Sequence, residues 1–94
     1  MSEVVAEFSV TPMVEGALKP FIDVAIDQIE KSGLNYEVGP VGTVIEGSLD
    51  SVVEAIKQAH QAVLSKGADR VVTDIRIDAK KGGISIEEEV EDYM

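Results

Sequence analysis

The amino-acid sequence predicts an α+β sandwich in which two helices cover one face of a four-stranded antiparallel sheet. Two segments repeat apolar residues with the 3.6-residue period of a helix, and four segments alternate apolar and polar residues as strands do. Their order is β-α-β-β-α-β, which is the ferredoxin-like pattern. Right-handed crossovers would then place the first and third strands side by side in the middle of the sheet. A chain of 94 residues has room for one hydrophobic core, so a single domain is expected over residues 1–94.

The first strand is predicted over Glu3–Thr11 and the first helix over Ala17–Ser32. Pro12 is expected to end the strand because proline cannot donate a hydrogen bond to a neighbouring strand. Gly33 suits the left-handed residue that commonly follows a helix. The helix carries a continuous apolar stripe at helical spacing, formed by Leu18, Phe21, Ile22, Ala25, Ile26 and Ile29.

A β-hairpin follows, with strands predicted over Leu34–Val38 and Thr43–Leu49. The intervening residues 39–42 read Gly-Pro-Val-Gly, which favours a turn because both glycines tolerate positive φ and proline fixes its own φ. Gly47, inside the second strand of the hairpin, indicates a bulge or the close approach of another backbone.

Asp50 or Ser51 is predicted to cap the second helix, since Ser51 and Glu54 have the spacing of a capping box. Gly67 is expected to end it. The fourth strand is predicted over Arg70–Asp78, where apolar and polar residues alternate again.

The last part of the chain is predicted to be a loop followed by a short C-terminal helix. Residues 80–83 read Lys-Lys-Gly-Gly, which is typical of a loop. Ser85 and Glu88 repeat the capping-box spacing, and Glu87–Glu89 would suit a first helical turn. A helix this short would have to dock on the domain or on a neighbouring subunit.

Composition limits the kinds of partner. Eighteen acidic residues against eight basic ones give a formal net charge of −10, whereas binding to nucleic acid or to an anionic membrane needs clustered Lys and Arg. Neither partner is expected, and a cationic small molecule better suits the electrostatic field of a negatively charged protein. The absence of cysteine excludes disulfides and thiolate catalysis, and no metal or cofactor is expected. With no apolar run long enough for a bilayer and no signal-peptide pattern, a cytoplasmic protein is expected.

The sheet face away from the helices is predicted to hold the functional residues. Glu7 and Glu46 fall on its two central strands, and neighbouring carboxylates need a proton, a cation or an arginine between them. Arg76 is one such partner, and a cationic or amidine-like ligand is another. Three apolar residues at the centre also suit a sheet-to-sheet dimer with a polar pocket at its seam: Val5, Val44 and Val72. A merely solvated sheet would show a similar pattern.

Catalysis is not expected from this sequence. His60 is the only histidine, and it falls at the edge of a helix's apolar stripe. No nucleophile, base and orienting group occur together in a recognisable pattern. Residues 39–43 lack the lysine of a phosphate-binding loop and do not open a helix.

Two stretches around the hairpin, SGLNYE at residues 32–37 and PVGTVIEG at residues 40–47, resemble the thiamine-binding protein family of small ferredoxin-like domains. The similarity extends to Glu7–Ser9 with Pro12, to Gly67–Thr73 and to Ile77–Asp78. It therefore covers nearly the whole chain.

The resemblance implies homo-oligomers, either dimers or dimers of dimers, that bind thiamine or its hydroxymethylpyrimidine part without chemical conversion. Carried over by position, it implies four ligand-binding residues: Ser9, Tyr36, Thr43 and Glu46. Glu46 would pair with the aminopyrimidine edge, and Ser9 and Thr43 would supply hydrogen bonds. Tyr36 would form an aromatic wall. The alternative is a regulatory or structural domain whose open sheet only assembles subunits.

Overall fold

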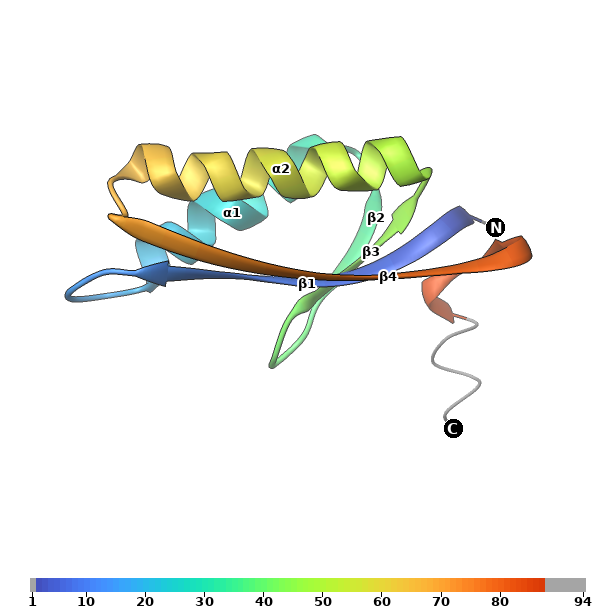
Figure 1. Cartoon of the computed structure of the whole chain (residues 1–94), viewed down its shortest axis with the longest axis horizontal. Coiled ribbons are helices and arrows are strands. Elements are labelled where there is room, and N and C mark those ends of the chain that lie inside the picture. The colour runs from blue at the N-terminus through green and yellow to red at the C-terminus, as the bar shows by residue number, and fades with distance from the viewer. Residues whose placement is uncertain (1, 88–94) are drawn as a thin grey trace.

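The computed structural model describes residues 2–87, and its helices and strands follow the predicted order (Figure 1). They are β1 (Ser2–Met13), α1 (Lys19–Lys31), β2 (Asn35–Val38), β3 (Thr43–Gly47), α2 (Leu49–Lys66) and β4 (Arg70–Ile84). The sheet is antiparallel with the order β2-β3-β1-β4, so β1 and β3 lie side by side in the middle, as predicted. Neither helix of the described chain is long and apolar enough to cross a membrane.

The main hydrophobic core lies between the sheet and the two helices, which both cover the same face (Figure 1). β1 contributes every second residue to it, as the alternation in the sequence predicts: Val4, Ala6, Phe8 and Val10. The largest fully buried side chains come from both helices and β3: Ile29, Ile45, Val52, Ile56 and Val63. The core is therefore aliphatic, with Phe8 as its one buried aromatic member among the described residues.

β1 continues through Pro12, contrary to the prediction that proline would end it. Pro12 lies opposite Val71 of β4, and the strand ends at Met13. The pairing of β1 with β3 stops at Phe8, so the last residues of β1 have a neighbouring strand on one side only. A residue without an N–H is tolerated on such a free edge.

The N-cap of α2 is Ser48, so the prediction of a cap at Asp50 or Ser51 was wrong. Ser48 is extended (φ −69°, ψ 154°), and its hydroxyl accepts a hydrogen bond of 3.1 Å from the backbone N–H of Ser51. Asp50 then lies in the first turn, where a carboxylate stabilises the helix dipole. Gly33 and Gly67 follow the two helices with positive φ, as predicted.

β3 ends at Gly47 and not at Leu49, and it contains no bulge. Gly47 pairs directly with Val4 in a regular register. Its close neighbour is a side chain, because a Cβ at Gly47 would lie 3.1 Å from the Leu34 side chain. The glycine therefore leaves room for packing between the hairpin and the core.

Residues 80–83 belong to β4, which reaches Ile84, so the predicted loop was wrong. Val4 lies opposite Ala79 but Ser2 lies opposite Ile84, which means that extra residues of β4 bulge out of the pairing. Gly82 and Gly83 have φ of 91° and 101°, values that glycine adopts without strain. A Gly-rich segment thus bends the strand instead of ending it.

The chain beyond β4 folds back under the face of the sheet that the helices leave uncovered. Ile84 and Ile86 are buried there and form a second cluster with Val5, against which Val44 packs. The predicted C-terminal helix is not supported as an element, because α1 and α2 both lie between strands and only residues 86 and 87 of the described chain are helical after β4. Most of its predicted length falls on residues 88–94, which lie outside the described residues.

Candidate functional site

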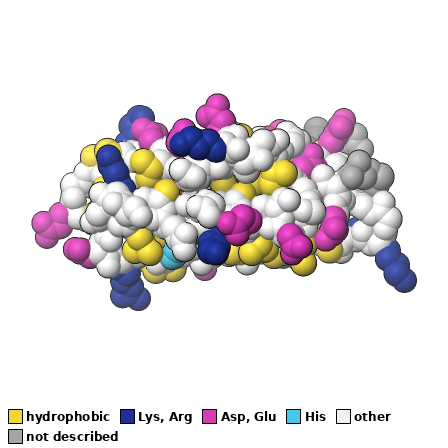
Figure 2. Space-filling model, turned by 90° about the horizontal axis from the view of Figure 1, so that it is seen from above, with side chains coloured by type: hydrophobic (Ala, Val, Ile, Leu, Met, Phe, Trp, Pro, Cys, Tyr) yellow, Lys and Arg dark blue, Asp and Glu magenta, His cyan; other side chains and the backbone are white. Residues whose placement is uncertain are grey.

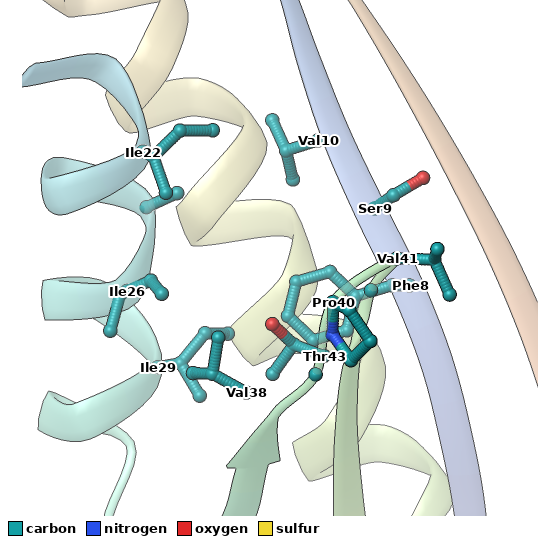
Figure 3. Close-up of a pocket in the computed structure, with 13 residues that line it drawn as sticks. Phe8, Ser9, Val10, Ile22, Ile26, Ile29, Val38, Pro40, Val41 and Thr43 are labelled. Carbon is teal, nitrogen blue, oxygen red and sulfur yellow. The ribbon is translucent and has the colours of Figure 1, made fainter. Parts of the chain in front are cut away.

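A pocket of about 280 Å³ lies between α1, β1 and the tip of the β2–β3 hairpin (Figure 3). Its walls are mainly apolar side chains: Phe8, Val10, Ile22, Ala25, Ile26, Ile29, Val38, Pro40 and Val41. The isoleucines of α1 face Phe8 and Pro40 across the cavity (Figure 3). The pocket is found where β2 ends at Val38 and the chain turns back toward β3.

Thr43 gives this apolar pocket a hydrogen-bonding group. It lies opposite Phe8 on β1 and Val38 on β2, on the face of the sheet that the helices cover. Its side chain is 9% exposed and forms no hydrogen bond to another described residue. Among the described residues no fully buried side-chain oxygen lacks a partner, so this hydroxyl is accessible from the pocket. Figure 3 shows its oxygen directed toward α1.

Ser9 lies on the opposite side of β1 from the helices. Its side chain points away from α1 in Figure 3, although the residue also lines the pocket. It contributes to a smaller cleft of about 150 Å³, together with Glu7, Val41, Asp74 and Arg76. Within residues 2–87 the ion pairs lie on α1, so Arg76 does not form the predicted bridge to a carboxylate there, although Glu7 is directly opposite it.

Glu46 lies on the uncovered face, and both of its carboxylate oxygens are bound by the chain itself. Asn35 Nδ2 donates a hydrogen bond of 2.7 Å to Oε1, and the backbone N–H of Ile86 donates one of 2.9 Å to Oε2. Glu46 therefore ties the segment after β4 to the hairpin. These hydrogen bonds account for the presence of a carboxylate among apolar neighbours, and no ligand is needed to explain it.

Tyr36 lies opposite Ile45 and is half-buried at the edge of the core. It does not line the pocket. The structure thus brings Ser9 and Thr43 to the cavity wall but places Tyr36 and Glu46 elsewhere.

The α1 side of the pocket was missed as a site, because Ile22, Ile26 and Ile29 look like an ordinary core stripe in the sequence. The stripe is wider than the sheet can cover, and Ile22 remains 37% exposed. The width of this apolar stripe was the one indication of a pocket in the sequence. On its own, a wide stripe does not distinguish a pocket wall from a packed helix face.

The chain matches the family model described as thiamine-binding protein over residues 6–94. It belongs to the thiamine-binding protein family. Curated relatives of this thiamine-binding family member carry the name UPF0045 protein. One from Clostridium perfringens is 38% identical over 85 residues, covering 89% of this chain and 90% of the relative. One from Methanocaldococcus jannaschii is 42% identical over 82 residues, covering 86% of this chain and 81% of the relative.

Solved structures show the same fold. A domain of unknown function from Bacillus cereus superposes with a TM-score of 0.90 at 36% identity, covering 99% of this chain and 91% of that one. A protein from Thermotoga maritima, provisionally named a thiamine biosynthesis/salvage protein, gives a TM-score of 0.84 at 37% identity, covering 97% and 98%. The α+β sandwich with one antiparallel sheet and two helices is therefore shared with these structures.

Proposed function

We propose that this member of the thiamine-binding family binds thiamine or its hydroxymethylpyrimidine part, with the pyrimidine ring in the pocket between α1 and the hairpin. The observation that carries the proposal is the hydroxyl of Thr43, which is nearly buried, accessible from the cavity and without a partner among the described residues. A ligand that bonds to this hydroxyl replaces water there, and such a hydrogen bond contributes about 0.5–1.5 kcal/mol.

The size and lining of the pocket suit one small aromatic ring. Its volume of about 280 Å³ lies just below the roughly 300 Å³ at which the range for ligand pockets begins, as expected for a site that takes only one small ring. Apolar side chains can cover both faces of a pyrimidine, and Phe8 supplies an aromatic ring. A threonine hydroxyl both donates and accepts, so it can serve either a ring nitrogen or the amino group.

An acidic residue near the hairpin tip, Glu7, favours the positively charged thiazolium ring of thiamine. Glu7 packs closely against Gly42, because a Cβ at Gly42 would lie 3.3 Å from Glu7 Cγ, and Gly42 itself lines the pocket. Together with a net charge of −10, this arrangement favours negative potential where the charged part of thiamine would leave the cavity.

The proposed function is binding without catalysis, in a homo-oligomer. The pocket is lined by no titratable side chain of the described residues, so it offers no general acid or base. Self-association is favoured by Ile75 and Ile77, which are 46% and 42% exposed on the outer strand β4. The same two residues favour the second candidate, a regulatory or structural domain that only assembles subunits.

Calorimetric titration with thiamine and with hydroxymethylpyrimidine tests this proposal. Thr43→Val keeps the shape of the side chain but removes its hydroxyl, so we expect binding to be weakened about three- to tenfold. Thr11→Val is the matched control, because Thr11 is exposed on the same strand as Ser9 and lies outside the pocket. A wild-type protein that shows no saturable heat with either compound would rule the proposal out. The second candidate, a domain that only assembles subunits, would then remain.

A further inference from the structure

The smaller cleft of about 150 Å³, on the uncovered face of the sheet, adjoins the pocket between α1 and the hairpin. The two cavities share three lining residues: Phe8, Ser9 and Val41. They meet where β1 loses a neighbour, because the pairing of β1 with β3 stops at Phe8. Figure 3 shows Ser9 and Val41 on the side of β1 that lies away from α1. A ligand with two parts can therefore occupy both cavities at once.

Four polar side chains surround the cleft and differ from the apolar lining of the pocket. Glu7 lies directly opposite Arg76, and Ser9 lies opposite Asp74, so the four form one group on two neighbouring strands. Within residues 2–87, none of the four side chains forms a hydrogen bond or an ion pair. Two carboxylates against one guanidinium leave the cleft with a net negative charge. It therefore favours a positively charged group of a ligand.

We propose that this cleft receives the thiazolium ring of thiamine while the pyrimidine ring occupies the pocket, and that the site thereby selects unphosphorylated thiamine over its phosphate esters. The inference rests on the proposed function and names the form of the vitamin that is bound. Thiamine joins a neutral ring to a cationic ring through one methylene group. Two adjacent cavities, one apolar and one acidic, are complementary to that structure.

The charges of the cleft disfavour a phosphate group. The hydroxyethyl arm on the thiazolium ring bears the phosphate in the esters of thiamine. When the arm is unmodified, its hydroxyl can bond to Ser9, because a serine hydroxyl both donates and accepts. A phosphate would instead bring about −1.5 to −2 charges toward Glu7 and Asp74. Arg76 is the only cation that lines either cavity in the described chain, so it cannot neutralise both carboxylates and a phosphate.

The carboxylates of the cleft act in addition to a general negative field. The chain has a net charge of −10, and Figure 2 shows acidic side chains along the whole helix side of the molecule. Exposed charges farther away than the Debye length, about 8 Å at physiological ionic strength, are largely screened. The selectivity should therefore depend on Glu7 and Asp74 and not on the total charge.

Calorimetric titration with four compounds tests the inference: thiamine, hydroxymethylpyrimidine, thiamine monophosphate and thiamine diphosphate. We expect the wild type to bind thiamine about fivefold or more tightly than either ester, because each ester faces two nearby carboxylates. Hydroxymethylpyrimidine lacks the thiazolium ring, so its affinity reports on the pocket alone.

Three variants change the charge of the cleft and nearly keep its shape. Glu7→Gln and Asp74→Asn should each weaken thiamine binding about two- to fivefold, the usual size of an exposed charge interaction. Both should leave hydroxymethylpyrimidine binding unchanged and narrow the difference between thiamine and its esters. Arg76→Gln removes the cation and should widen that difference.

Asp78→Asn is the matched control. Asp78 is an exposed carboxylate on the same face of β4, but it lies four residues beyond Asp74, roughly 13 Å along the strand, and lines neither cavity. This variant should bind all four compounds like the wild type. The same loss of thiamine affinity in Asp78→Asn as in Asp74→Asn would overturn the inference, because the general field would then explain both.

Two further results would overturn the inference alone. One is a wild type that binds the phosphate esters as tightly as thiamine. The other is a Glu7→Gln or Asp74→Asn protein that loses as much affinity for hydroxymethylpyrimidine as for thiamine. A wild type that binds neither thiamine nor hydroxymethylpyrimidine would overturn the proposed function itself, and this inference with it.

Discussion

Replacing Ile26 with tryptophan is expected to weaken thiamine binding by about a hundredfold or more while the protein remains folded. Ile26 is half-buried on α1 and lines the cavity between that helix and the hairpin (Figure 3). The indole ring would occupy the volume that the pyrimidine needs, whereas the existing space limits overpacking of the core. Calorimetric titration measures the affinity, and thermal unfolding measures the stability.

Leu64→Trp is the control for the added ring, because Leu64 is 43% exposed on α2 and does not line the pocket. It should bind thiamine like the wild type. Unchanged affinity of a folded Ile26→Trp protein would place the ligand outside this cavity.

Replacing Glu46 with alanine is expected to lower the free energy of unfolding by about 1–3 kcal/mol, because two hydrogen-bond donors lose their acceptor. These donors are the Asn35 side chain and the backbone N–H of Ile86. Glu46→Gln should cost less, since its amide oxygen can still accept from Ile86. Chemical denaturation measures the stability, and hydrogen exchange at the Ile86 amide reports whether the segment after β4 is released.

Glu37→Ala is the matched control, because Glu37 is an exposed carboxylate on the neighbouring strand β2. It should leave both stability and exchange nearly unchanged. Thiamine affinity should also survive Glu46→Ala. A loss of affinity in Glu46→Ala at unchanged stability would instead make Glu46 a ligand-binding residue, as the family resemblance implies.

The order of the elements could be predicted because it depends on local patterns. Alternation along β1 identified its buried face, and the 3.6-residue stripe identified α1. The ends of the helices and strands were harder to predict, because they depend on contacts with neighbouring parts of the folded chain. Pro12 is tolerated where β1 has a strand on one side only, and Ser48 caps α2 although Asp50 and Ser51 have equally suitable side chains.

The site was harder to predict because its residues come together only in the folded chain. Glu46 accepts a hydrogen bond from the backbone N–H of Ile86, 40 positions later, and no local sequence pattern predicts that contact. Ile22, Ile26 and Ile29 form the same stripe whether a helix packs fully or leaves a cavity. Thr43 was selected by resemblance, and the structure adds the reason that its hydroxyl has no partner within the described chain.

The most direct test of the proposed ligand pocket is an NMR titration of the isoleucine methyl groups with thiamine. Isoleucines lie in separate regions: Ile22, Ile26 and Ile29 line the pocket, while Ile84 and Ile86 lie under the sheet with Val5, where Ile86 bonds to Glu46. We expect saturable shifts at the three methyl groups of α1 and little change at Ile84 and Ile86. Shifts confined to Ile84 and Ile86, or no shifts at saturating thiamine, would contradict binding between α1 and the hairpin.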